Sequence, residues 1–401
     1  MRAGPVVAAG ALVLAACTQS PAQLRQDQTP TSPGVSAPAP ASASVTTGGS
    51  SSTAPETVAT ASATPTGRGS VVGSSRVRTT AVARLPLPAG VRLTGLAVSQ
   101  ERVAWTACRS CRAPDAVATE VRVAAAPRAG AARVVARTSP GRTATVLGFA
   151  GDALIWLDVG ADRGKSWALR LVDVRTGTTR SLAEGEASGP GAGPPVVSIS
   201  GRTVTWQLYD LAAGRGPVLA QDVGGGRSRV VVPDLPGQLR GVTVQGLVYT
   251  ANDPAVPTVV PNAPVPYDMY LWSSAGRPRN LTRGHNIAEA VATADGVVWR
   301  VVADAESLVY APWPGGTPVR LVTGPVRAFG AGRGFGAWVT REEDAVVQLS
   351  TGGSLVTLPD APPPDGGKLA VDSDLVAFVG APDRGGPSWS LVVVRVVSGA
   401  R

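Results

Sequence analysis

Histidine, lysine and cysteine are nearly absent from this chain of 401 residues. His285 is the single histidine, lysine occurs only at positions 165 and 368, and cysteine occurs at 17, 108 and 111. A metal centre built from several histidines is therefore excluded, and the one CxxC motif lacks the second pair that a four-thiolate zinc site requires. We expect no metal site and no cofactor.

The chain also lacks the signature of a serine hydrolase. A Ser-His-Asp triad would have to use His285, and no Gly-x-Ser-x-Gly elbow is present. We therefore assign no catalytic residue. One enzymatic alternative stays open, a hydrolase or lyase that uses acidic residues brought together by loops. Its candidates are Glu342, Glu343, Asp344, Asp162 and Asp383.

Acidic residues are outnumbered, and aromatic residues make up only 4% of the chain. The formal charge is +9, nearly all of the positive charge being arginine. On an exported protein, a basic surface favours anionic headgroups or wall polymers over nucleic acid. We expect a protein or an anionic wall polymer as partner, no nucleic acid, and a monomer.

The first 17 residues have the pattern of an export signal. Arg2 gives a positive start, and the apolar stretch from Val6 to Ala16 is too short to span a bilayer. Leu14-Ala-Ala-Cys17 follows and resembles the bacterial lipobox, in which the cysteine is lipidated and becomes the mature N-terminus. The resemblance implies lipid attachment at Cys17 and a domain held at the extracytoplasmic face of the cell membrane.

Residues 18–78 have the composition of a disordered linker. They are rich in Ser, Thr, Ala, Pro and Gly, contain no aromatic residue and show no strand or helix periodicity. As a flexible chain such a segment spans on the order of 40–50 Å. The remaining residues, 79–401, are expected to form one domain.

A short phrase recurs through residues 79–401: a polar or glycine turn, then an apolar run that ends in an aromatic residue. It ends at Trp105, Trp156, Trp206, Tyr249, Trp299, Trp338 and Phe378. The spacing of roughly 40 to 50 residues is the period of four-stranded propeller blades. Alternating apolar and polar residues and glycine-centred turns indicate four strands in each unit, and no sustained helical pattern occurs. The fold class is all-β.

The last unit is incomplete. It contains strands at 368–371, 375–379 and 391–397, and the sequence then ends without a fourth strand. A spare strand, Thr80–Leu87, precedes the first unit and would close the ring by pairing with 391–397. We predict a seven-bladed β-propeller closed by this N-terminal strand. Six blades would require the Tyr249 unit to be an insertion.

The repeats resemble the propeller domains of the TolB-like and WD40-like families of bacterial envelope proteins. The resemblance covers about residues 80–401 and rests on the turn, apolar run and aromatic residue and on the four-strand spacing. It implies an architecture, and because propellers host enzymes, carriers and scaffolds alike, it implies no single activity.

Loop length predicts the interaction surface. The connections between second and third strands vary widely and all emerge at one face of a propeller, whereas the first turns are uniformly short. Two such connections share Asp and Arg at their tips and a Trp where the next strand begins; they carry Asp162, Arg163 and Trp167, and Asp383, Arg384 and Trp389. These residues could form a ligand site, or be turns whose Asp binds its own backbone and whose Trp covers a sheet edge. His285 lies on or near the same face.

Cys108 and Cys111 form the CxxC motif within one of these connections. Redox activity of the thioredoxin type needs this motif at the start of a helix, and here it lies between strands. We therefore expect a local disulfide between Cys108 and Cys111. As a whole, the sequence predicts a membrane-anchored binding or scaffold module for an envelope protein or wall-associated ligand.

Lipid attachment at Cys17 can be tested by substitution. A Cys17→Ala variant loses the only attachment point for the lipid, so we expect it to move from the membrane fraction to the soluble extracytoplasmic fraction. Fractionation followed by immunoblotting measures this, with labelled palmitate incorporated by the parent chain and not by the variant. Retention of Cys17→Ala in the membrane would refute the lipid anchor.

Overall fold

The computed structural model describes residues 76–87, 91–99, 102–108, 119–126, 132–160, 165–186, 193–252, 267–273, 277–283, 287–293, 296–301, 306–313, 316–340, 345–349, 356–358, 368–380 and 389–399. Every regular element in these ranges is a β-strand, which confirms the all-β prediction. No helix among these residues is long and apolar enough to cross a membrane.

The strands form four-stranded antiparallel sheets, numbered here in chain order. Sheet 1 contains β2 (Arg92–Val98), β3 (Arg102–Cys108), β4 (Glu120–Ala125) and β5 (Arg133–Arg137). Sheet 2 contains β6 (Arg142–Ala150), β7 (Ala153–Gly160), β8 (Ser166–Asp173) and β9 (Thr179–Glu186). Sheet 3 contains β10 (Val196–Ser200), β11 (Thr203–Gln207), β12 (Gly216–Asp222) and β13 (Arg229–Leu235).

The later sheets repeat the same order. Sheet 4 contains β14 (Gln238–Thr243), β15 (Gly246–Asn252), β16 (Tyr267–Trp272) and β17 (Arg279–Asn280). Sheet 5 contains β18 (Ile287–Ala292), β19 (Gly296–Val301), β20 (Ser307–Pro312) and β21 (Val319–Thr323). Sheet 6 contains β22 (Val326–Gly332), β23 (Phe335–Thr340), β24 (Ala345–Leu349) and β25 (Val356–Thr357). Sheet 7 contains β26 (Leu369–Asp372), β27 (Leu375–Gly380), β28 (Ser390–Gly399) and β1 (Arg76–Pro86).

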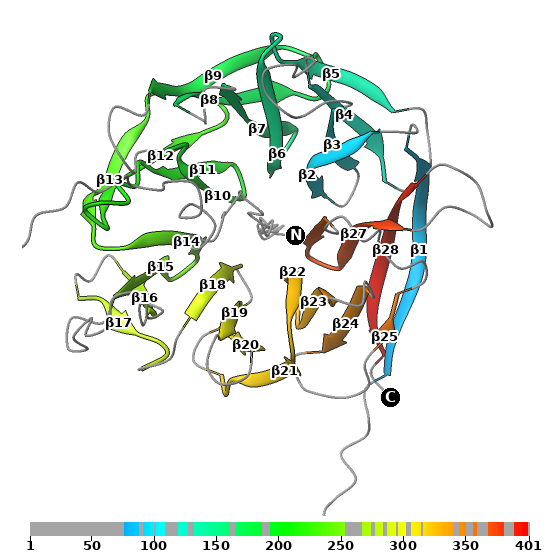
Figure 1. Cartoon of the computed structure of the whole chain (residues 1–401), viewed down its shortest axis with the longest axis vertical. Helices are drawn as coiled ribbons and strands as arrows, with labels where there is room; N and C mark the ends of the chain where they lie inside the picture. Colours follow the sequence, from blue (N-terminus) through cyan, green and yellow to red (C-terminus); the bar gives the residue numbers. More distant parts are fainter. Residues whose placement is uncertain are drawn as a thin grey trace, which may run out of the picture. The chain divides into compact units, whose positions relative to one another are not determined.

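These sheets stand around a common centre (Figure 1). The first strands, such as β6, β10, β14, β18 and β22, lie nearest the centre, and the fourth strands, such as β9, β13 and β21, lie at the periphery. This radial arrangement of four-stranded sheets is a β-propeller, as the recurring phrase predicts.

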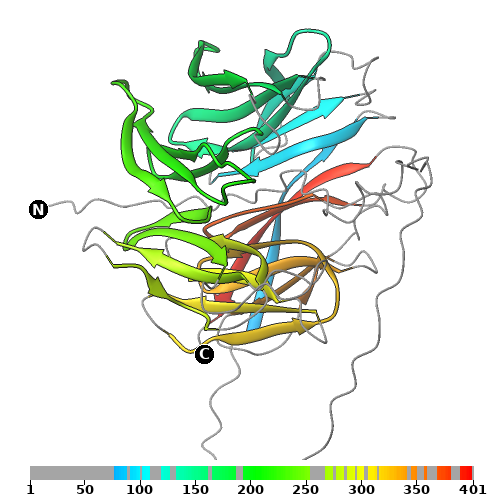
Figure 2. The same cartoon turned by 60° about the vertical axis from the view of Figure 1, so that its left-hand side comes forward.

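Sheet 7 is assembled from both ends of the domain. β1 pairs antiparallel with β28, from Arg76 opposite Gly399 to Pro86 opposite Ser390, and the sheet order is β1-β28-β27-β26. Figure 2 shows β1 and β28 side by side in the turned view. The pairing is the one expected for Thr80–Leu87, although β1 begins at Arg76, ahead of residue 79 where the domain was predicted to begin. β1 thus covers the edge of β28 that would otherwise be unpaired.

The turn residue of the recurring phrase explains why glycine occurs there so often. Gly151 and Gly201 begin the turns between the first two strands of sheets 2 and 3, with φ of 63° and 57°. Glycine adopts this left-handed conformation without a steric penalty. In sheet 7 the same position is Ser373, one of only two described non-glycine residues with positive φ, at 52°.

The aromatic residues of the phrase pack between sheets. Their exposure ranges from 0% for Phe378 to 6% for Trp299. Each belongs to an apolar cluster shared with the preceding sheet; Trp206 of sheet 3, for example, lies with Ile155 and Leu169 of sheet 2. Phe378 lies with Phe335 of sheet 6, and Trp105 lies with Leu375 of sheet 7. Because burying an aromatic side chain contributes several kcal/mol, these contacts hold neighbouring sheets together.

Truncating Trp206 tests this role. Trp206 is 1% exposed, so Trp206→Ala should leave a cavity between sheets 2 and 3 and lower the free energy of unfolding by about 3–5 kcal/mol. Val244→Ala is the control, because Val244 is 75% exposed and its truncation should cost less than about 0.5 kcal/mol. Urea unfolding measures both. Equal losses for the two variants would show that the contact between sheets carries little stability.

Candidate functional site

The connections between second and third strands all emerge at one end of the sheets, because the strands alternate in direction. We call this the loop-bearing end. Most of these connections lie outside the described residues, and with them Asp162, Arg163, His285, Asp383 and Arg384 of the predicted site. Glu342, Glu343 and Asp344 lie outside the described residues too. The connection between β11 and β12, residues 208–215, is described in full.

Residues 208–215 form a loop that is held by its own hydrogen bonds. The Asp210 carboxylate accepts bonds from the backbone N–H groups of Ala212 (2.8 Å) and Ala213 (3.0 Å). Arg215 forms an ion pair with Asp234 of β13 at 3.0 Å. Leu211 stands at the tip and is 67% exposed, and Leu208 is 39% exposed. An apolar side chain presented on a fixed turn is suited to contact with another macromolecule.

A charged cluster lies beside this loop at the same end of sheets 4 and 5. We call Tyr209, Arg240, Tyr267, Glu289, Arg300 and Glu306 the inner cluster. Arg240 and Glu289 are on β14 and β18, the first strands of their sheets, which lie near the centre in Figure 1. Arg300 is on β19 and contacts both glutamates of the cluster. Its Nη1 atom is 3.3 Å from Glu306 Oε1, and its Nη2 atom is 3.6 Å from Glu289 Oε2.

Arg300 also links two sheets. Its Nη1 atom donates to the carbonyl of Val326, the first residue of β22, at 3.3 Å. Its Nε atom is buried without a hydrogen-bond partner. Arg300 is therefore committed to Glu289, Glu306 and the neighbouring sheet, and it positions both carboxylates.

Burial dominates the titration of the inner cluster. It raises the pKa of the Glu289 carboxyl above its ordinary value, against the opposing effect of Arg300 and Arg240. Burial also lowers the pKa of Arg240 and raises the pKa of the Tyr209 hydroxyl. Loss of hydration on burial therefore disfavours the charged forms of both Arg240 and Glu289.

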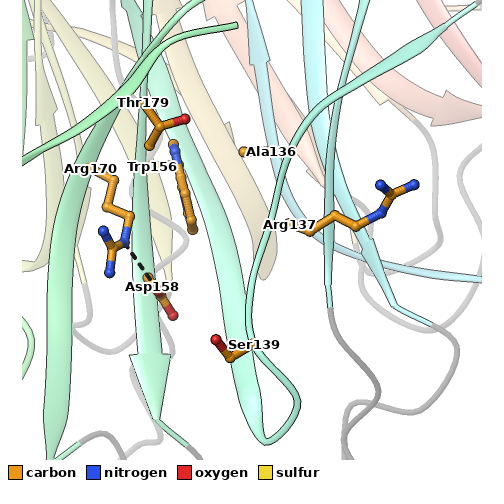
Figure 3. Close-up of a pocket in the computed structure, with 7 residues that line it drawn as sticks. All are labelled: Ala136, Arg137, Ser139, Trp156, Asp158, Arg170 and Thr179. Carbon is orange, nitrogen blue, oxygen red and sulfur yellow. Dashed lines mark hydrogen bonds and ion pairs between the residues drawn. The ribbon is translucent and has the colours of Figure 1, made fainter.

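A second polar site lies in a hollow of about 210 Å³ between sheets 1 and 2. Its lining residues are drawn in Figure 3: Ala136, Arg137, Ser139, Trp156, Asp158, Arg170 and Thr179. In this view Trp156, Asp158 and Arg170 lie together on sheet 2, and the Arg137 guanidinium points away from them. The Trp156 indole N–H is buried without a hydrogen-bond partner, as are those of Trp105 and Trp338 in other sheets. The unpaired N–H is thus a feature of several sheets and does not mark this hollow.

Asp158 is the centre of an ion-pair network in the hollow. It is 4% exposed, and its two carboxylate oxygens accept bonds from Arg142 Nε at 2.7 Å and Arg170 Nε at 3.1 Å. Arg142 also reaches Ser166 Oγ at 3.0 Å, and the Arg170 guanidinium lies 5.9 Å from the Trp156 ring centre. Because both oxygens are occupied by guanidinium groups, Asp158 ties three strands together and is not available as a base.

Another buried acid lies at the opposite end of the sheets. Burial raises the pKa of Asp372 to about 6, and the neighbouring Asp374 acts in the same direction. Asp372 is the last residue of β26, and Asp374 lies in the turn that leads to β27. The described residues contain no group of three or more His, Cys, Asp or Glu side chains that could hold a metal ion.

Three predicted site residues are within the described ranges. Trp167 is buried at 7% exposure and packs in the core between sheets 2 and 3, against Gly185. Trp389 is half-buried against the core of sheets 7 and 1. Cys108 is disulfide-bonded, and its predicted partner Cys111 lies outside the described residues. Ligand binding by Trp167 and Trp389 stays a prediction, and both rings have a packing role.

Sequence reasoning missed Arg240, Glu289 and Arg300. Glu289 and Arg300 each interrupt an otherwise apolar strand, Ile287–Ala292 and Gly296–Val301, and such a charged residue is the signal that could have found them. Arg240 lies in the mixed strand Gln238–Thr243, which gives no such signal. Which of these residues meet could not be read from the sequence, because they come from different sheets.

Comparison with known proteins supports the fold and no more. No family model and no curated protein sequence matches the chain. Among solved structures, it is similar to the β-propeller domain of the Trilobed protease from Pyrococcus furiosus, which has an open velcro topology, at 11% identity and a TM-score of 0.52, covering 76% of this chain and 94% of that one. It is similar to the acylaminoacyl peptidase of Pyrococcus horikoshii at 9% identity and a TM-score of 0.52, covering 75% of this chain and 51% of the peptidase.

A third similar structure is an oligogalacturonate lyase in complex with manganese, at 13% identity and a TM-score of 0.49, covering 81% of this chain and 94% of the lyase. Of these three structures, the protease and the peptidase have TM-scores above 0.5. At these identities the likeness shows a β-propeller fold alone, which is the class of protein to which the chain belongs.

Removing the Asp158 carboxylate tests its structural role. Asp158→Ala would leave Arg142 without its ion pair and Arg170 with only the exposed Glu184 at 3.9 Å, both in a partly buried site. We therefore expect a loss of about 3–5 kcal/mol in the free energy of unfolding. The control is Asp152→Ala, because Asp152 pairs with Arg102 at 2.8 Å but is 68% exposed, and its loss should cost less than about 1 kcal/mol. Chemical denaturation compares them. If Asp158→Ala unfolds with the stability of the control, the network is not a structural tie.

Proposed function

We propose that this chain is a lipid-anchored, extracytoplasmic binding module. It is a seven-bladed propeller, closed by β1, that is tethered through Cys17 and the linker before β1 and engages a protein of the cell envelope at its loop-bearing end. The arrangement of seven four-stranded sheets, with β1 completing the last, supports the architectural part.

One observation carries the proposed binding surface: the ordered loop 208–215 presents Leu211 at 67% exposure beside the inner cluster. Tyr209, Tyr267 and Arg240 lie in the inner cluster beside it, and tyrosine and arginine are enriched at protein interfaces. The loop needs no rearrangement before binding, because Asp210 and Arg215 already hold it. Preorganisation of this kind reduces the entropic cost of association.

The alternative is a hydrolase or lyase with acidic residues at the same end. Among the described residues of that end, the two carboxylates of the inner cluster, Glu289 and Glu306, are both paired with Arg300. Asp158 is likewise occupied by two arginines. No described observation favours catalysis over binding.

Site-specific photo-crosslinking tests the proposed surface. A photoreactive residue replaces Leu211 in one variant and Val244 in the other, because both are exposed aliphatic positions, at 67% and 75%, on opposite ends of the sheets. In intact cells we expect a discrete protein adduct from position 211 and none from position 244. Leu211→Asp should weaken capture of that same protein by about tenfold, equivalent to about 1.4 kcal/mol.

The design separates the proposed surface from its rivals. Equal adducts from both positions, or none from position 211, would overturn it. An adduct that contains wall polymer in place of protein would place a different partner at this end and refute the protein-binding proposal.

A further inference from the structure

Arg240 is positioned by an irregularity in sheet 4. The pairing of β14 with β15 passes from Leu239 opposite Tyr249 to Gly241 opposite Val248, so Arg240 is left out of the ladder. The first and second strands of sheets 1, 2, 5 and 6 have the same one-residue shift, so the bulge belongs to the repeat, and in sheet 4 the residue that it leaves out is an arginine. Gly241, the next residue, packs closely against β18, because a Cβ atom on Gly241 would lie only 2.7 Å from Ala292.

Among the residues that the structure describes, the guanidinium of Arg240 forms one hydrogen bond. Its Nε–H donates to Thr250 Oγ1 at 2.9 Å, which sets the orientation of the planar group. Within the described residues Arg240 forms no ion pair, whereas Arg300 takes both Glu289 and Glu306. Within the described residues, no hydrogen bond or ion pair reaches the two terminal nitrogens of Arg240.

Those neighbours come from three sheets. Tyr209 follows β11, Tyr267 begins β16 and Glu289 is on β18, and each interacts electrostatically with Arg240. Tyrosine hydroxyls can donate to an anion, as can the forked N–H groups of a guanidinium. A half-buried cation without an ion pair is stabilised by any anion that reaches it, since the cost of its desolvation has already been met by folding.

We propose that the terminal nitrogens of Arg240, together with the hydroxyls of Tyr209 and Tyr267, bind a compact oxyanion, a carboxylate or a phosphate, at the loop-bearing end. This rests on the proposed function in one respect: it names the chemistry of the group that this end accepts. The oxyanion is either free in solution or carried by the docked partner, and the bidentate geometry of arginine suits both carboxylate and phosphate.

Binding is coupled to the protonation of Glu289. An anion on Arg240 and an ionised Glu289 repel each other, so the site binds most tightly when Glu289 is neutral. Burial raises the pKa of Glu289, while Arg240 and Arg300, the charged groups that act on it, oppose that shift. Affinity should therefore fall as pH rises through the Glu289 pKa, by up to about tenfold for each pH unit.

Titration of the whole chain with two probes, inorganic phosphate and glutarate, tests the site. The signal is the NMR resonance of the Arg240 Nε–H group, observed at constant ionic strength. We expect this resonance to shift in a saturable way as the anion is added. Calorimetry compares the affinities, and Arg240→Gln should bind the anion at least about tenfold more weakly than the parent chain. Arg202→Gln is the matched control, because Arg202 is 64% exposed in the turn between β10 and β11, at the opposite end.

A second variant keeps the test valid if Arg240→Gln folds poorly. Glu289→Gln should bind glutarate more tightly than the parent chain at a pH above the Glu289 pKa, and it should lose the fall in affinity that the parent chain shows as the pH rises through that pKa. Both proteins are titrated with the same probe, so the difference between their slopes reports the protein and not the ionisation of glutarate. Preference for phosphate or for glutarate distinguishes a phosphate ester from a carboxylate as the group bound.

The outcomes separate this site from the proposed function. Equal binding by Arg240→Gln and the parent chain, no saturable shift, or an unchanged pH slope in Glu289→Gln would overturn the anion site. If the adduct at position 211 persists in those cases, the proposed function stands. Anion binding without an adduct at position 211 would leave the anion site and remove the protein partner.

Discussion

Burial of one aromatic side chain per unit against the preceding sheet is the constraint on which the structure depends. The second strand of each sheet carries this residue, from Trp105 to Phe378, and each lies in an apolar cluster that spans two sheets. A four-stranded sheet alone cannot bury both of its faces. Packing in a ring gives every sheet two neighbours, and β1 completes the last sheet so that the ring closes on itself.

This packing confines polar chemistry to the ends of the strands. The middles of the second strands are buried and apolar, as in β27, whose six residues are all buried. Charged groups therefore gather where strands begin and end. Two arrangements of arginine occur at the loop-bearing end: Arg142 and Arg170 both bind Asp158, whereas Thr250 is the one hydrogen-bond partner of Arg240 among the described residues. The first arrangement stabilises the fold, and the second leaves a cation able to bind.

A module of this kind separates tethering from recognition. The proposed lipid at Cys17 and the linker before β1 would provide reach, and a rigid propeller would present one end to a partner. A similar fold occurs in a protease and in a peptidase, and a fold by itself assigns no activity. The role proposed for this chain therefore rests on the side chains at its loop-bearing end, above all Leu211 and Arg240.

The sequence by itself determined the all-β class, the position of each aromatic and the strand that completes sheet 7, because these depend on periodicities along the chain. The sequence also predicted the turns at Gly151 and Gly201, because glycine adopts the left-handed conformation of these turns without a steric penalty. Tertiary structure alone decided that Trp167 packs in the core and that Arg240, Glu289 and Tyr209 meet. These residues come from different sheets, and the curvature that brings sheets together arises from packing across the ring, which no local pattern records.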